Sequence, residues 1–140
     1  MPIALDDVCF NKASIIERCL VRVFEEARLD PGLSNWSHID ALVMNLERAC
    51  QAAIDLAMHL VSRDRLGMPQ NSAEAFQLLQ RSGVLTEPTT QSLAAMVGFR
   101  NVAVHSYQSL SLVVVRTIVE KDWRVFVDFA RELGLRVDPR

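Results

Sequence analysis

Apolar residues recur every three or four positions along most of the chain, which is the spacing that lines one face of an α-helix. One such run extends over residues 5–27 and is followed by Pro31-Gly32, a pair that ends a helix. A second run, over residues 39–61, keeps the period for about six turns, with Asn35 or Ser37 available as its N-cap. The alternating pattern of a strand and the Asn-Gly or Asp-Gly dipeptides of a hairpin are both missing from the sequence.

Three more helical stretches follow. Asn71 and Glu74 resemble a capping box that opens a short helix ending at Gly83. A threonine-capped stretch then runs through residues 93–104, and a long one runs from about residue 109 to residue 133. The last stretch is apolar over a wide arc, which is typical of a helix that is central in a bundle or shared with another subunit. The pattern predicts an all-α, up-and-down bundle of about five helices that forms a single domain over residues 1–140.

The composition fits this fold and narrows the functions. Half of the 140 residues are hydrophobic and 23% are charged, which excludes an intrinsically disordered chain. Fifteen basic and seventeen acidic side chains give a net charge of −2, so the chain lacks the overall basic field of a protein that coats nucleic acid. Any RNA site must therefore concentrate positive charge locally. The amino terminus resembles no signal peptide, and the longest apolar stretch, residues 110–119, is too short to span a bilayer. A cytoplasmic protein without membrane contact is expected.

The cysteine pattern argues against a metal centre. Cys9, Cys19 and Cys50 lie in apolar helical patterns without CxxC or Cys/His spacing. An odd number of cysteines in this arrangement favours buried thiols in a reducing compartment over a disulfide framework or a zinc site. No metal and no other cofactor is predicted.

Most polar residues have structural explanations. His38 lies at the start of the second predicted helix and is expected to be a surface or capping residue. Glu47, Gln51, Asp55 and His59 are spaced four apart and line one helical face. This is the pattern of a solvated face with i,i+4 contacts. The alternative is that this face lines a cleft in which Asp55 orients a basic group.

The segment Gly98–Tyr107 differs because it gathers an arginine, an asparagine, a histidine and the chain's one tyrosine. Composition alone favours a helix end whose basic groups complement the helix dipole. On a regular helix, His105 lies about 140° around the axis from Arg100, whereas Tyr107 shares the face of Arg100. Arg100 and His105 can converge on one point if the helix loosens near Val104, or if a second subunit contributes its own copy.

Residues 100–107 have the pattern R-N-x-x-x-H-x-Y, which resembles the Arg-x4-His-x-Tyr signature of HEPN domains in the HepT toxin family. The similarity extends to the preceding Gly98-Phe99, to NLERACQAAIDLAMHL (residues 45–60) and to SAEAFQLLQRSGVLT (residues 72–86). It covers about residues 8 to 130. Arg-x4-His alone is a weak signal, but the complete motif late in an all-helical chain of this length is a strong one.

The resemblance implies the toxin ribonuclease of a type VII-like toxin–antitoxin system. Arg100 and His105 correspond to the ribonuclease pair, and Asn101 fills the polar position after the arginine. Tyr107 corresponds to the tyrosine that an MntA-like nucleotidyltransferase antitoxin modifies with AMP. Ser106 stands where the family commonly has an acidic residue, a departure that leaves the motif intact. The implied partners are the antitoxin, an RNA substrate (tRNA or mRNA) and a second copy of the chain.

These residue types suit RNA cleavage without a metal. The 2′-OH attack needs a base, an acid for the departing 5′-oxygen and positive charge on the phosphorane. Histidine exchanges protons near neutral pH, and the planar guanidinium of arginine matches two phosphate oxygens. One histidine does not readily serve as both acid and base, so a dimer that brings two copies of His105 and Arg100 into one cleft is expected.

Two alternatives remain open at this point. The motif of a non-catalytic HEPN-like subunit would bind a nucleotide or dock a nucleotidyltransferase. A helical dimerisation domain with no ligand would use the same segment only for packing. RNA cleavage by the purified chain separates the toxin from both.

Overall fold

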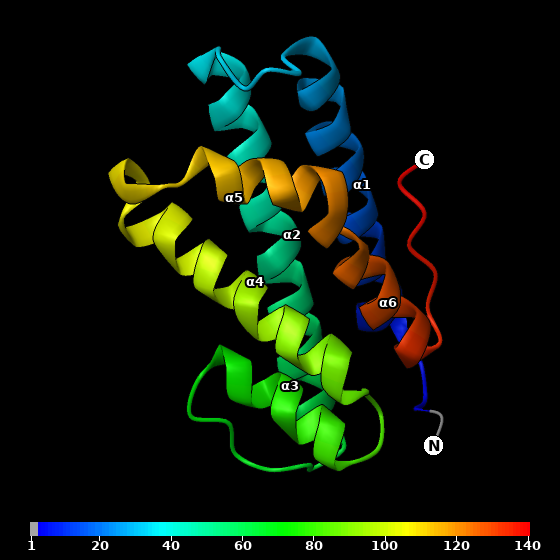
Figure 1. The fold of residues 1–140 in the computed structure, drawn as a ribbon. Helices are drawn as coiled ribbons and strands as arrows, with labels where there is room; N and C mark the ends of the chain where they lie inside the picture. Colours follow the sequence, from blue (N-terminus) through cyan, green and yellow to red (C-terminus); the bar gives the residue numbers. More distant parts are fainter. Residues whose placement is uncertain (1–2) are drawn as a thin grey trace.

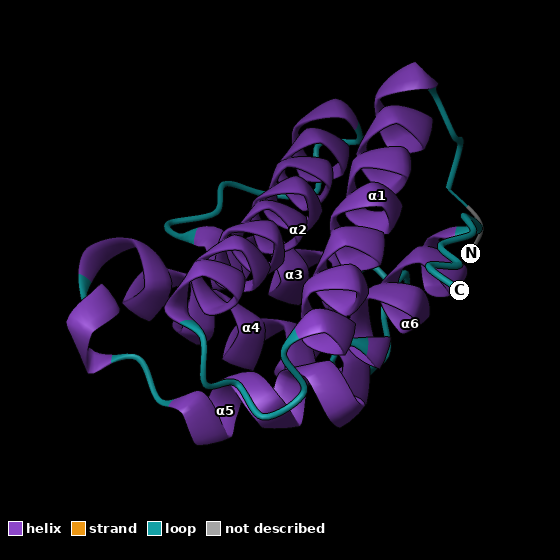
Figure 2. Cartoon of the chain, turned by 90° about the horizontal axis from the view of Figure 1, so that it is seen from above, coloured by secondary structure: helices purple, strands orange, loops and turns teal. Residues whose placement is uncertain are grey.

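The structure, a computed structural model, describes residues 3–140, and every regular element in that range is helical. The two longest helices, α1 (Asp7–Leu29) and α2 (Trp36–Arg63), pack side by side in opposite directions along most of their length (Figures 1 and 2). The side chain of Asn35 accepts a hydrogen bond from the Ser37 amide at 2.9 Å and caps α2. The predicted antiparallel pair and one of its two proposed caps are therefore confirmed.

The short helix α3 (Ser72–Arg81) and the longer α4 (Glu87–His105) come next. The Asn71 side chain accepts from the Glu74 amide at 2.9 Å, and the Glu74 carboxylate accepts from the Gln70 amide at 3.3 Å. The predicted cap of α3 is thus present. These two helices cover one side of the α1–α2 pair (Figure 1).

The predicted fifth helix is divided into several pieces. After a 3₁₀ turn (Tyr107–Ser109), α5 (Leu112–Thr117) passes through a π-turn (Ile118–Asp122) into α6 (Arg124–Leu133). In the π-turn the Trp123 amide donates to the Ile118 carbonyl at 2.9 Å, a bond between residues five apart. This spacing lets Ile118 and Trp123 both face the core, whereas a regular helix would turn one of them away.

The simple up-and-down order holds only for the first part of the chain. In Figure 1, α4 runs obliquely and α5 lies across the long pair. Arg116 of α5 donates to the carbonyls of Pro31 and Gly32 at 3.3 and 3.1 Å, which ties this crossing helix to the loop between α1 and α2. The hydrophobic periodicity predicted the helices but carried no information on this crossing direction.

The core is continuous from α1 to the carboxyl-terminal residues. Its largest fully buried side chains come from all the longer helices: Phe76, Phe126, Phe129, Ile16, Leu20, Ile39, Leu42, Leu46, Leu56, Leu60, Leu79 and Leu93. The three cysteines are free and buried, as predicted. Complete burial raises the pKa of the Cys50 thiol to about 12, so it stays protonated and unreactive at neutral pH. None of the helices in the described range is both long and apolar enough for a bilayer crossing. The prediction about the amino terminus rests partly on residues 1–2, outside the described range.

Candidate functional site

Helix α4 carries the predicted site residues Arg100, Asn101 and His105, and hydrogen bonds to α6 hold its start. The Glu132 carboxylate of α6 accepts hydrogen bonds from the Thr86 amide at 2.8 Å and from the Thr89 hydroxyl at 2.5 Å. The helix then runs without interruption to His105, and the Ser106 amide still donates to the Val102 carbonyl at 2.9 Å. The helix therefore does not loosen near Val104, which removes the first of the two ways in which Arg100 and His105 could converge. Within one chain, Arg100 and His105 leave the axis in directions about 140° apart.

Arg100 is half-buried and has no acidic partner within residues 3–140. Its Nη1 donates to the Asn101 side-chain oxygen at 3.1 Å, while its Nε is buried without a hydrogen-bond partner among the described residues. A buried donor without a partner costs free energy, because it has given up water and gained nothing in return. The guanidinium is thus a cation whose capacity to bind an anion is only partly used.

His105 occupies the last position of α4 and is exposed. Within the described residues no hydrogen bond or ion pair involves its ring. The other two histidines each contact a carboxylate: His38 lies 2.5 Å from Glu26, and His59 lies 2.7 Å from Asp6. His105 is therefore the histidine whose ring has no polar partner among the described residues.

Tyr107 follows in the 3₁₀ turn and is half-buried against the start of α2. Its hydroxyl donates a hydrogen bond to the Asp40 carboxylate, and its ring meets the Trp36 ring edge-on with centroids 6.4 Å apart. Burial, together with the negative charge of Asp40, raises the pKa of Tyr107 to about 12. The sequence did not link Tyr107 with Asp40, which lies 67 positions earlier in the chain.

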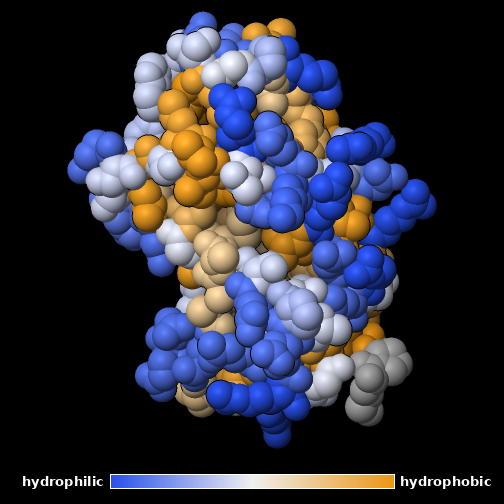
Figure 3. Space-filling view, viewed as in Figure 1, coloured by the Kyte–Doolittle hydropathy of each residue, from blue (hydrophilic) through white to orange (hydrophobic). Residues whose placement is uncertain are grey.

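The end of α4 and the start of α5 expose several apolar side chains near the site. Val102 and Val104 are partly exposed, Val114 is 45% exposed and Val113 is 75% exposed. Figure 3 shows apolar side chains gathered over this region of the surface. Exposed apolar side chains are typical of an interaction site. Val102 and Val104 point to different sides of α4, about 200° apart, and we use the name valine patch for these four exposed residues together.

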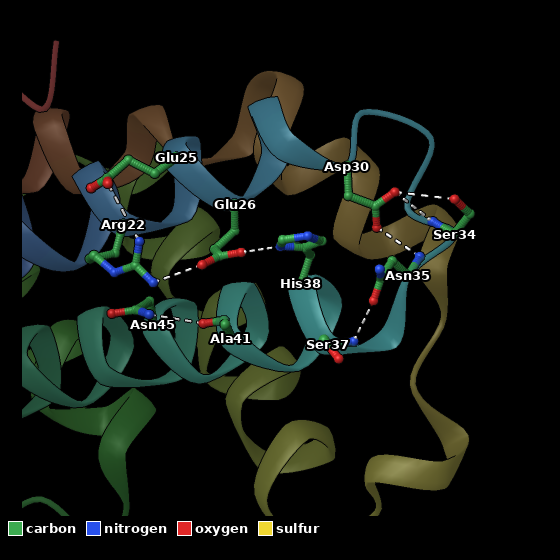
Figure 4. Close-up of polar contacts among 10 residues, drawn as sticks. All are labelled: Arg22, Glu25, Glu26, Asp30, Ser34, Asn35, Ser37, His38, Ala41 and Asn45. Carbon is green, nitrogen blue, oxygen red and sulfur yellow. Dashed lines mark hydrogen bonds and ion pairs between the residues drawn. The ribbon is translucent and has the colours of Figure 1, made fainter.

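A separate polar cluster lies where α1 ends and α2 begins (Figure 4). The Glu26 side chain, only 11% exposed, bonds to His38 and accepts from Arg22 at 2.7 Å. These two partners lower the pKa of Glu26, with His38 contributing more. Asp30 accepts from the amides of Asn35 and Ser34 at 2.9 and 3.1 Å and holds the connecting loop. His38 is thus paired with a nearly buried carboxylate, whereas a surface or capping residue was predicted and Asn35 is the cap.

The opposite end of the α1–α2 pair contains a second polar group. Asp6 caps α1 through the Cys9 amide and also contacts His59 and Arg63, which together lower the pKa of its carboxyl group, with His59 contributing most. Ligand atoms of Asp6, Cys9 and His59 lie within 4.8 Å of one another. The sequence spacing predicted no cluster of metal ligands. The fold nevertheless brings these three potential ligand residues together. The Arg63 guanidinium, 3.1 Å from Asp6, nevertheless opposes a second cation there.

The predicted polar face of α2 has ordinary i,i+4 contacts. The Gln51 side chain donates to Asp55 at 2.8 Å, and Lys12 of α1 lies 3.4 Å from the same carboxylate. Asp55 therefore pairs with a lysine of the neighbouring helix. All four residues of this face are half-buried, and His59 contacts Asp6 just before α1. The prediction of a solvated face is therefore only partly correct, and the basic group beside Asp55 is Lys12.

Comparison with known proteins gives a consistent result. The family model for Ribonuclease HepT-like proteins matches residues 14–133. The mRNA nuclease HepT of Shewanella oneidensis is 36% identical over 129 residues, which covers 89% of this chain and 96% of that protein. The tRNA nuclease HepT of Aphanizomenon flos-aquae is 31% identical over 90 residues, which covers 64% of this chain and 61% of that protein.

Solved structures extend the similarity to three dimensions. A tri-AMPylated HEPN toxin of Shewanella oneidensis, in complex with an MNT antitoxin, superposes with a TM-score of 0.88 at 34% identity, covering 93% of this chain and 98% of that one. A toxin–antitoxin structure with AMP-PNP gives a TM-score of 0.87 at 33% identity, covering 92% of this chain and 99% of that one. At these identities the similarity extends beyond the fold to the family.

Proposed function

Because this chain belongs to the HepT-like ribonuclease family, we propose that it is the cytoplasmic toxin ribonuclease of a type VII-like toxin–antitoxin pair. Residues 1–140 form its one domain, Arg100 and His105 cleave RNA with Asn101 beside them, and AMP on Tyr107 silences it. The proposal is supported most directly by the absence of acidic partners, among the described residues, at two side chains. Arg100 has a buried Nε without a partner, and His105 is exposed without a carboxylate.

The cleavage step follows from the chemistry of these groups. The imidazole of His105 accepts the proton of the ribose 2′-OH as the oxygen attacks the adjacent phosphorus, and a second imidazole donates a proton to the departing 5′-oxygen. The guanidinium of Arg100 binds two oxygens of the phosphorane and stabilises its added charge. Asn101 contacts Arg100 at 3.1 Å and orients the guanidinium. Together these groups fill the roles of the step, so a metal-independent reaction is proposed.

A homodimer supplies the second imidazole. Because α4 is regular through His105, one chain does not bring Arg100 and His105 to the same point, whereas two chains around a two-fold axis contribute two of each. The valine patch flanks His105 in the sequence and leaves apolar surface exposed beside it. Burying this surface against a second copy would place the two α4 ends next to each other. The dimer would thereby concentrate basic charge at one place, although each chain has a net charge of −2.

An MntA-like nucleotidyltransferase is the proposed antitoxin. The similar Shewanella oneidensis toxin is tri-AMPylated in complex with an MNT antitoxin, and Tyr107 is the chain's one tyrosine. Tyr107 follows His105 by two residues, so an attached AMP places bulk and negative charge where the phosphate of the RNA would bind. Both effects oppose RNA binding.

Cleavage of tRNA and mRNA by the purified, unmodified chain in the presence of EDTA tests the proposal. We expect cleavage products in EDTA, their loss in His105→Ala and Arg100→Ala, and their loss in the wild type after treatment with the antitoxin and ATP. Tyr107→Phe should cleave RNA but remain active after that treatment. Intact RNA with an unmodified wild-type dimer would favour a non-catalytic subunit that binds a nucleotide or docks the nucleotidyltransferase.

A further inference from the structure

Tyr107 meets one charged side chain, and that side chain comes from a different helix. Its hydroxyl donates to a carboxylate oxygen of Asp40, and the nearby Trp36 packs against the edge of its ring. Asp40 is exposed, and within residues 3–140 it is the only charged group that hydrogen-bonds to the phenol. The phenolic proton therefore already points at an acceptor.

Asp40 lies in the first turns of α2, and contacts of the preceding loop hold this end of the helix in place. Asp30 holds the two amides that precede α2, at 3.1 and 2.9 Å (Figure 4). Arg116 donates to the carbonyls of Pro31 and Gly32 and thereby ties α5 to the same loop. The start of α2 is thus held by Asp30 and, through the preceding loop, by Arg116, and the turn containing Tyr107 contacts it through Asp40 and Trp36.

We infer that Asp40 is the proton acceptor for nucleotidylation of Tyr107, so that the toxin itself supplies the base for its own inactivation. The inference rests on the proposed modification of Tyr107. In the step, the tyrosine Oη forms a bond to the α-phosphorus of ATP while the bond from that phosphorus to the bridging oxygen breaks. Pyrophosphate leaves, the phenolic proton passes to Asp40, and Asp40 then releases it to water.

The chemistry of the pair suits this step. A neutral phenol is a weak nucleophile, and an aspartate that accepts its proton as the phosphorus is attacked performs the role that the catalytic aspartate performs for the substrate hydroxyl in protein kinases. The same contact also favours movement of the modified side chain away from Asp40. The attached phosphate is negative and lies beside the Asp40 carboxylate, so repulsion displaces the modified side chain from α2.

Rates of AMP transfer test the inference, measured with a purified MntA-like nucleotidyltransferase and α-labelled ATP. The acceptors are wild type, Asp40→Asn, Asp40→Glu and Asp7→Asn. Asp7 is an exposed acid at the start of α1 that serves as the matched control. Circular dichroism and RNA cleavage by each unmodified chain confirm that it is folded, and Asp40→Ser replaces the asparagine variant if that variant is not.

We expect the kcat of transfer to fall about 10²-fold in Asp40→Asn, to be partly retained in Asp40→Glu and to be unchanged in Asp7→Asn, with little change in KM for ATP. At each pH the wild-type rate is divided by the Asp40→Asn rate, so that the pH dependence of the transferase cancels. We expect this ratio to fall about tenfold per pH unit between pH 7 and 9. This follows because only the variant depends on spontaneous phenolate formation.

Three results would overturn the inference. An Asp40→Asn chain modified at the wild-type rate would show that Asp40 takes no part in the step. A reduced rate whose ratio to wild type stays constant with pH would assign Asp40 a purely positional role. A folded wild-type chain that accepts no AMP would refute the modification of Tyr107, and the inference together with it.

Discussion

The three histidines divide the molecule into two regions with different chemistry. At the two ends of the α1–α2 pair, His38 and His59 lie 2.5 and 2.7 Å from carboxylates that other groups also hold. At the end of α4, His105 is exposed and has no such partner in the described part of the chain. Paired imidazoles lock helices together, whereas an unpaired one is available to a substrate. The proposed function therefore assigns His105, and not His38 or His59, to the reaction.

Two of the arginines, Arg22 and Arg100, show the same contrast. Arg22 donates to Glu26 at 2.7 Å and lies 3.5 Å from Glu25, so its charge is neutralised within the fold. Arg100 contacts only the neutral side chain of Asn101 and keeps a buried Nε without a partner. Among the described residues, the buried side-chain donors without a partner are Arg100 Nε and Trp123 Nε1, and only the first belongs to a charged group. Unused capacity of a cation to bind an anion therefore lies near the end of α4.

The largest expected effect comes from removing the planar guanidinium of Arg100. Arg100→Ala should lower the rate of RNA cleavage about 10³-fold, because the phosphorane loses its fixed positive charge. Arg100→Lys should recover only part of this, because an ammonium keeps the charge but not the two parallel donors. Cleavage rates of the folded variants measure both effects, with Arg131→Lys, a change at an exposed arginine of α6, as the control. Full activity in Arg100→Lys would contradict the role of the planar guanidinium.

A charge in the valine patch should have the next largest effect. Val113→Asp is expected to yield monomers and to lower cleavage at least 10-fold, because each chain keeps its motif but loses the second imidazole. Met68, which is 84% exposed on the loop after α2, gives the matched control Met68→Asp. Molar mass by light scattering and the cleavage rate are the measurements. An active Val113→Asp monomer would show that one chain suffices.

Removing a charge from the paired region should change stability instead of activity. Glu26→Gln keeps the shape of the side chain but loses the charge that holds Arg22 and His38. We expect its thermal midpoint to fall by a few degrees while cleavage per folded chain stays at the wild-type level. Thermal unfolding followed by circular dichroism, together with cleavage rates at a temperature where both chains are folded, checks this. Loss of cleavage in the folded variant would place His38 in the site.

The smallest effect concerns acid stability. The pKa of Asp6 is lowered in the folded chain, most by His59 and then by the Cys9 amide, so its ionised form stabilises the fold at neutral pH. That contribution is present above the unfolded pKa of about 4 and is lost as the pH falls toward the folded value. The midpoint difference between wild type and Asp6→Asn should therefore be largest at pH 5 to 7 and shrink below about pH 4. A difference independent of pH would contradict the ionic origin.

The helices and most of their ends could be predicted from the sequence, because hydrophobic spacing and capping residues act locally. Asn35, Asn71 and Pro31-Gly32 are examples. The π-turn before Trp123 could not, because the periodic pattern continues through it and only packing decides which residues face inward. The crossing of α5 depends on Arg116 and two distant carbonyls, and no local pattern encodes that contact.

The residues of the candidate site could likewise be predicted only in part. The motif at the end of α4 and in the 3₁₀ turn after it pointed to Arg100, Asn101, His105 and Tyr107 because they lie close together in the sequence. The contact of Tyr107 with Asp40 joins residues 67 positions apart, and the grouping of Asp6, Cys9 and His59 joins α2 to the start of α1. Such contacts arise from the packing of helices, so spacing along the chain does not show them.

A matched set of histidine variants tests the division between the two regions most directly. His105→Gln, His38→Gln and His59→Gln are compared for RNA cleavage and for the free energy of unfolding. We predict that His105→Gln cleaves RNA about 10² to 10⁴-fold more slowly with unchanged stability, and that the other two lose stability but keep the wild-type rate when folded. A fully active His105→Gln chain, or a folded His38→Gln or His59→Gln chain as inactive as the His105 variant is expected to be, would contradict the account.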